Sequence, residues 1–157
     1  MKRCIAYIAI LALVVAAPAK PVDIGELIPI RAMGVWQAGK QIQVETDAGN
    51  TGIGETVEYA IRDMKETASG VIYLDKVEYL ILTEQTLDAA EALRGELNGR
   101  VGLCVVQQPV DLGEVSHYLD VHGTLPKLKT WSKGVKLPSI SSYKKTQTFS
   151  KKSEKRY

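Results

Sequence analysis

Apolar and polar side chains alternate regularly along the stretch QIQVET, residues 41–46. The second, fourth and sixth of these residues project to one side of an extended chain, and the other three project toward water. The preceding stretch QAGK contains Gly39, which can adopt the positive φ of a tight turn. We therefore predict a β-hairpin within residues 23–47, and the solvent-facing side of its second strand favours antiparallel pairing.

A helical period replaces this alternation after residue 56. Apolar residues recur at helical spacing and gather on one stripe, which consists of Val57, Ala60, Ile61, Met64 and Ala68. Gly70 is suited to end this helix. A second helix is predicted within residues 84–99, with an inner side made of Leu87, Ala90, Leu93 and Leu97. A third, short helix within residues 111–123 faces inward with Leu112, Val115 and Leu119.

Two segments between these helices are apolar on both faces, which is typical of strands in the centre of a sheet. They are residues 79–82 and 100–107, and Asp75-Lys76 forms a tight turn or a kink ahead of the first. The predicted order is β-β-α-β-α-β-α. Because a strand–helix–strand unit calls for a parallel pair with a right-handed crossover, we predict an α+β fold, a small mixed β-sheet with helices packed on it.

The N-terminus has the three parts of a secretory signal. Basic residues precede an uncharged apolar run over residues 5–17, and Ala17 and Ala19 supply the small side chains of a cleavage site. The alternative is a membrane anchor, but thirteen residues fall short of the roughly 20 needed to span a bilayer. Cys4 precedes the apolar run, which argues against lipid attachment. We predict a signal peptide over residues 1–19 and a secreted or extracytoplasmic protein.

Charge divides the remaining chain in two. Residues 20–125 carry eight basic and seventeen acidic residues, and residues 126–157 carry ten basic residues and one acid. Ser, Thr, Lys and Pro dominate the second part, a composition that buries too little apolar surface to offset the entropy of ordering. We therefore predict one α+β domain over 20–125, with Cys104 as a buried hydrophobe, and a basic, mostly disordered tail over 126–157.

The basic tail suits attachment to an anionic surface. Outside a cell that surface is a membrane or a cell-wall polymer and not nucleic acid, and the predicted contact residues are Lys144, Lys145, Lys151, Lys152, Lys155 and Arg156. Two alternatives remain open: a solubilising extension that binds nothing specific, and a tail that folds back on the acidic domain.

The stretch GNTGIGET resembles a phosphate-binding loop, with Gly49, Gly54 and Thr56 on the pattern G-x-x-x-x-G-K-[ST]. Glu55 stands where that motif has the lysine that reaches the phosphates. A glutamate is favoured at the start of a helix because the peptide dipoles make that end positive. We interpret the stretch as a structural turn between a strand and a helix, formed by Gly49, Gly52, Gly54, Glu55 and Thr56, and predict no cofactor.

Three potential metal ligands lie together in HYLDVH, namely His117, Asp120 and His122. A zinc site needs three or four converging ligands, and His117 projects away from the apolar side of its predicted helix. Neither a G-x-S-x-G nor an H-E-x-x-H motif occurs. We predict no metal and no catalytic residue. The alternative is a small extracytoplasmic enzyme or metal-binding protein that uses this cluster or Glu55.

Residues 41–107 resemble the N-terminal domain of Ger(x)C-type spore germination proteins. In that family a strand leads through a glycine-rich turn into a helix and then into an aromatic-aliphatic strand. The matching positions here are Gly52, Gly54, Thr56, Ala60, Tyr73, Leu80, Ile81 and Glu84. The chain differs in having no lipid-attachment cysteine after its apolar run and a basic tail in place of further domains. The resemblance implies a free-standing, non-enzymatic relative that binds a partner in the cell envelope, with an envelope protein as one candidate.

Overall fold

The predicted hairpin is present in the computed structural model, which describes residues 27–140. Strand β2 (Ala32–Ala38) pairs antiparallel with β3 (Gln41–Thr46), and the turn between them places Gly39 at φ 64°. A third strand, β4 (Thr51–Gly54), continues the antiparallel pairing on the far side of β3. Gly49, at φ 81°, lies in the turn that joins β3 to β4. This half of the sheet is thus a meander of three strands.

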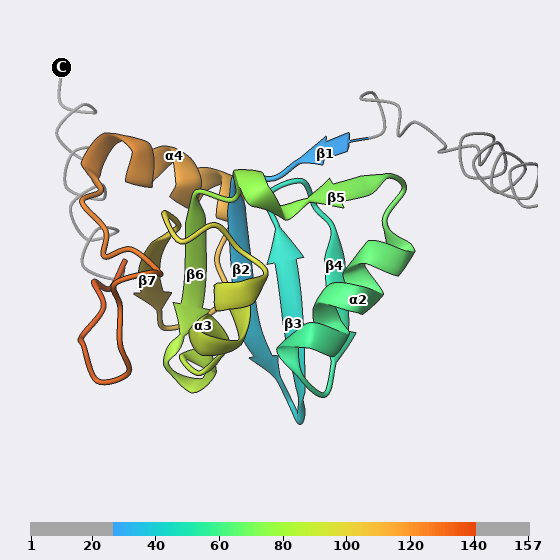
Figure 1. Ribbon diagram of the computed structural model, residues 1–157, viewed down its shortest axis with the longest axis horizontal. Coiled ribbons are helices and arrows are strands. Elements are labelled where there is room, and N and C mark those ends of the chain that lie inside the picture. The colour runs from blue at the N-terminus through green and yellow to red at the C-terminus, as the bar shows by residue number, and fades with distance from the viewer. Residues whose placement is uncertain (1–26, 141–157) are drawn as a thin grey trace, which may run out of the picture.

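The other half of the sheet is parallel. Strand β6 (Tyr79–Thr83) runs parallel to β2, and β7 (Gly102–Val106) runs parallel to β6, which gives the order β4-β3-β2-β6-β7. Every residue of β7 is buried, as expected for a strand that is apolar on both faces. The predicted α+β class and the mixed sheet are therefore confirmed (Figure 1).

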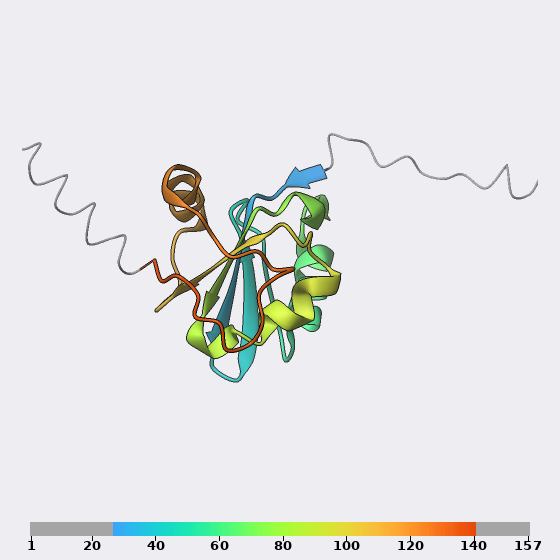
Figure 2. The same cartoon turned by 60° about the vertical axis from the view of Figure 1, so that its left-hand side comes forward.

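Helices cover both faces of this sheet (Figure 2). Helix α2 (Val57–Thr67) and helix α3 (Ala89–Ala92) pack on one face, where they enclose the larger part of the core. Helix α4 (Leu112–His122) packs on the other face against Trp36, Ile81 and Cys104. The inner sides predicted for the first and third helices are confirmed, since Met64 and Leu119 are among their buried residues. The result is a three-layer arrangement.

The second predicted helix is broken into three short pieces, so a continuous helix over residues 84–99 was wrong. A 3₁₀ turn η3 (Glu84–Thr86) precedes α3, and another, η4 (Leu93–Gly95), follows it. The first turn is held by a capping box between Thr83 and Thr86, and the buried Thr86 hydroxyl also donates to the carbonyl of Val35 at 2.8 Å. A residue fixed to the sheet in this way prevents η3 from joining a regular helix.

A small parallel pair lies outside the main sheet. Strand β1 (Leu27–Pro29) pairs with β5 (Val71–Tyr73), and β5 is followed by the 3₁₀ turn η2 (Leu74–Lys76). The turn lies where the sequence predicted a turn or kink at Asp75-Lys76. The two three-residue strands themselves were not predicted, since segments of this length show no period.

The segment 126–140 is packed on the body, which corrects the predicted boundary of the tail at residue 126. Four of its apolar side chains are buried in the core, namely Leu128, Trp131, Leu137 and Ile140. Backbone hydrogen bonds join it to the free edge of β7 at both ends: Leu103 N–H donates to the carbonyl of Pro126 at 2.9 Å, and Val105 N–H donates to that of Pro138 at 3.0 Å. Residues 141–157 of the predicted tail lie outside the described residues, as does the predicted signal peptide.

Candidate functional site

The glycine-rich stretch is largely a strand and not the turn that we predicted. Gly52 and Gly54 belong to β4, and the chain reverses earlier, at Gly49. The two strand glycines are needed because α2 lies directly on them. A methyl group on Gly52 would approach the carbonyl oxygen of Ala60 to 2.1 Å, and one on Gly54 would approach the Ala60 nitrogen to 2.5 Å. The glycines therefore serve a close helix–strand contact.

Side chains of this stretch and of α2 cap the start of the helix and the edge of β4. The Thr56 hydroxyl is the N-cap and accepts from the N–H of Tyr59 at 3.4 Å. The Ile53 N–H donates to the Asp63 carboxylate at 2.9 Å. The hydrogen bond between Glu58 and Thr56 lowers the pKa of the Glu58 carboxyl. The Glu55 side chain is exposed to solvent. A phosphate-binding loop presents free amides, whereas β4 pairs with β3 and its Ile53 N–H is bonded to Asp63.

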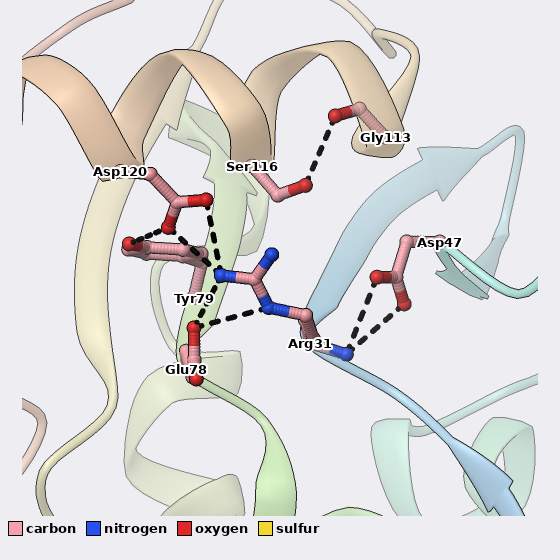
Figure 3. Close-up of polar contacts among 7 residues, drawn as sticks. All are labelled: Arg31, Asp47, Glu78, Tyr79, Gly113, Ser116 and Asp120. Carbon is pink, nitrogen blue, oxygen red and sulfur yellow. Dashed lines mark hydrogen bonds and ion pairs between the residues drawn. The ribbon is translucent and has the colours of Figure 1, made fainter.

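A network of charged side chains connects three elements at the amino ends of β2 and β6 (Figure 3). Arg31 precedes β2, Glu78 precedes β6, and Asp120 projects from α4. The Arg31 guanidinium donates to Glu78 at 2.8 Å and to Asp120 at 2.8 Å, and the Tyr79 hydroxyl donates to Asp120 at 2.8 Å. The backbone N–H of Arg31 points to the carboxylate of Asp47, at 3.2 Å from Oδ1. The network thus ties α4 to the sheet.

The contacts in this network shift three pKa values. The pKa of Asp120 is lowered by its hydrogen bonds from Tyr79 and Arg31. Burial, followed by the hydrogen bond to Asp120, raises the pKa of Tyr79 to about 12. The pKa of Arg31 is raised by its bonds to Glu78 and Asp120. All three groups keep their ordinary charge at neutral pH, so the network is suited to holding α4 in place and offers no group poised for proton transfer.

The histidine cluster does not converge in the part of the chain that the structure describes. Asp120 turns toward Arg31 and Tyr79, and His117 is exposed on the outer side of α4. Among the side chains that the structure describes, no three of His, Cys, Asp or Glu are placed to share a metal ion. His122 ends α4, and its side chain is not among those described. Cys104, the lone cysteine of the described residues, is buried, and burial raises its thiol pKa to about 12.

A pocket of about 420 Å³ lies at the opposite end of the parallel strands from this network. Glu84 and Gln85, which follow β6, form one side, and residues 131–139 form the other. Buried side chains, including Val105, Trp131 and Leu137, line its floor. Thr83 and Thr86, whose hydroxyls lie 3.0 Å apart, fix the turn that carries Glu84 and Gln85. One side of the pocket is therefore fixed to the sheet by hydrogen bonds, and the other side is the segment that follows Trp131.

Sequence reasoning missed this pocket because it assigned residues 126–140 to a disordered tail. A signal was present: an apolar residue recurs every three to six positions at Leu125, Leu128, Trp131, Leu137 and Ile140. The irregular spacing fits neither a regular helix nor a strand, and the Ser, Thr, Lys and Pro content of the segment favours disorder. The six basic residues predicted to contact an anionic surface, Lys144 to Arg156, lie outside the described residues.

No protein-family model, no curated protein and no solved structure matches the sequence or the fold.

Proposed function

We propose that this protein is an exported, non-catalytic binding protein held at an anionic surface of the cell envelope by its basic C-terminal residues. The observation that carries the proposal is the place where the packed body ends. Buried core residues continue to Ile140, and six basic residues and one acid follow it in the sequence. The body itself, residues 27–140, has eleven basic and fifteen acidic residues.

This distribution of charge favours attachment through residues 141–157. An acidic body is repelled by anionic lipid headgroups and wall polymers, whereas each basic residue near such a membrane contributes on the order of 1 kcal/mol. A few residues engaged together are enough for reversible attachment. Salt weakens it, because the Debye length falls from about 10 Å at 0.1 M to about 3 Å at 1 M.

Export rests on the N-terminal sequence pattern, and the relation to germination proteins rests on the resemblance over residues 41–107. Within the described part of the chain, none of the helices combines the length and the apolar character needed to cross a membrane. The proposed partners are an anionic membrane or wall polymer and, through the body, an envelope protein.

Co-sedimentation tests the attachment. The full-length protein is expected to sediment with phosphatidylglycerol vesicles or purified cell wall at 0.05 M salt and to remain in solution at 1 M salt. It is not expected to sediment with phosphatidylcholine vesicles. A chain truncated after Ile140 keeps the whole described core and is the matched control, expected to stay in solution throughout. Equal sedimentation of the two chains at low salt would refute attachment through the basic residues. Stoichiometric zinc in the purified protein, lost in His117→Ala, would refute the prediction of no metal and favour the alternative of a metal-binding protein.

A further inference from the structure

The pocket beside η3 lies where sheets of this kind bind ligands. Strands β6 and β7 are parallel, and Glu84 and Val105 place the pocket at their carboxyl ends. In open α/β sheets, ligands bind in the crevice outside the carboxyl ends of the strands. The volume of the pocket, about 420 Å³, lies within the range of about 300–1,000 Å³ that small-molecule sites occupy.

The floor of the pocket is apolar and firmly held. Trp131 is 3% exposed and Leu137 is 7% exposed, so both belong to the core while contributing to the pocket wall. The Trp131 indole N–H donates to the carbonyl of Val135 at 3.0 Å, and Arg94 donates to the Trp131 carbonyl. A preformed apolar floor favours a ligand that carries an apolar group.

The charged residues around the floor are divided between two walls. Asp88 and Lys133 form an ion pair at 2.7 Å across the opening. Glu84 on the η3 side and Lys136 on the opposite side are exposed, and neither forms an ion pair within residues 27–140. One free carboxylate therefore stands on one wall and one free ammonium on the other, above an apolar floor.

We propose that this pocket binds a small zwitterion with an apolar side group, a molecule with the chemistry of a free hydrophobic amino acid or dipeptide. Glu84 receives its ammonium group, Lys136 receives its carboxylate, and the side group lies on Trp131 and Leu137. A ligand with one charge of each sign can pair with both Glu84 and Lys136. An anion or a cation alone pairs with only one of them and is repelled by the other. The site is separate from the proposed surface attachment, and the two are tested with different probes.

The two tryptophans make the test specific. Trp131 lies at the pocket, and Trp36 lies on the other face of the sheet, where its indole N–H donates to Glu45 at 3.1 Å. The full-length protein is titrated with L-leucine and with leucyl-leucine while both indole N–H signals are followed by NMR. Binding at the pocket is expected to shift the Trp131 signal in a saturable manner and to leave the Trp36 signal in place.

Blocked probes and charge variants identify the contacts. N-acetyl-leucyl-leucine lacks the ammonium group, leucyl-leucine amide lacks the carboxylate, and each is expected to bind about tenfold more weakly, the loss typical of one charged hydrogen bond. E84Q should bind leucyl-leucine and N-acetyl-leucyl-leucine with equal affinity. K136Q should bind leucyl-leucine and leucyl-leucine amide with equal affinity. K129Q, which removes a lysine of the same segment outside the pocket, should bind like the unchanged protein. No shift of Trp131 at millimolar probe, or equal binding of free and blocked dipeptides, would overturn the proposal.

Discussion

At the scale of the residue, Gly52 shows how a glycine can be required without a special backbone angle. Its φ is not positive, and only Gly39, Gly49 and Gly134 adopt positive φ among the described residues. The requirement comes from the helix, because a methyl group at position 52 would lie 2.1 Å from one backbone atom of α2 and 2.4 Å from another, the nitrogen of Met64. Backbone atoms cannot turn away as a side chain can, so relief requires α2 to move off the strand.

Substitution of this glycine should therefore be destabilising. G52A is expected to lower the free energy of unfolding by about 1–3 kcal/mol, the range for overpacking a well-packed interface. G95A is the control, since a methyl group there meets nothing within 4 Å and the glycine has no positive φ. Urea denaturation followed by circular dichroism measures both. A G52A protein as stable as G95A would show that α2 does not lie on β4 as described.

At the scale of the element, helix α4 depends on polar contacts at its C-terminal half as well as on its buried side. Leu112, Val115 and Leu119 pack on the sheet, and Asp120 in the next position bonds to Arg31 and Tyr79. The side chains of Arg31 and Glu78 are about half exposed, at 48% and 52%, so their ion pair is screened by solvent. The network therefore orients the helix more than it stabilises the fold.

The network predicts a defined response to pH. The pKa of Asp120 is lowered in the folded state, so its contribution to stability is present above the unfolded value of 3.8 and is lost as the pH falls through the folded value. The pKa of Tyr79 is raised, so its contribution is present below 10.0 and is lost as the pH rises toward about 12. Stability arising from the network should be constant between these limits.

Carboxyl-detected NMR titration measures the acid limb. Y79F and R31M are each expected to raise the pKa of Asp120, since each removes one of the two leading causes of its depression. Y59F, which changes a half-exposed tyrosine of α2, serves as the control. If the pKa of Asp120 is the same in Y79F, R31M and the unchanged protein, the network does not exist in solution.

At the scale of the whole molecule, the two edges of the sheet are protected to different extents. The β4 edge is flanked by α2, and Asp63 accepts the outward N–H of Ile53. The β7 edge is hydrogen-bonded by residues 126–140, and Ile140 N–H donates to the Val105 carbonyl at 3.0 Å. Open edges are the usual route to association through sheet extension, and residues 126–140 close that route along β7. On β4 the Asp63 carboxylate occupies the N–H of Ile53, and the Ile53 side chain stays 47% exposed.

The position of the segment 126–140 predicts a sharp difference between two truncated proteins. A chain that ends after Leu125 loses four buried apolar side chains, and single core truncations of leucine or tryptophan already cost about 2–5 kcal/mol. Because net stability is commonly about 5–15 kcal/mol, this chain should lose cooperative unfolding. A chain that ends after Ile140 should keep the thermal midpoint of the full-length protein. Equal midpoints for the two truncated chains would show that the segment is not part of the core.

The elements that could be predicted are those with a clear period. The alternation over 41–46, the helical stripe of α2 and the apolar side of α4 follow from side-chain direction alone. Strand β4 was missed because its two glycines lower strand propensity. These glycines are needed for close contact with α2, a helix that follows later in the chain. The Arg31 network was missed because positions 31, 78 and 120 become neighbours only when the sheet forms. The charged walls of the pocket required residues 131–139 to pack, which no period indicated.

The closing of the β7 edge by residues 126–140 has a consequence for how the protein is made. The strand GLCVV is fully buried in the finished fold, and it leaves the ribosome before the residues that cover it. Until residue 140 is available, the growing chain holds an uncharged, β-prone segment with a bare edge, the type of sequence that aggregates. Assembly of this domain therefore depends on residues up to 140, and a chain broken off before residue 140 leaves that strand uncovered.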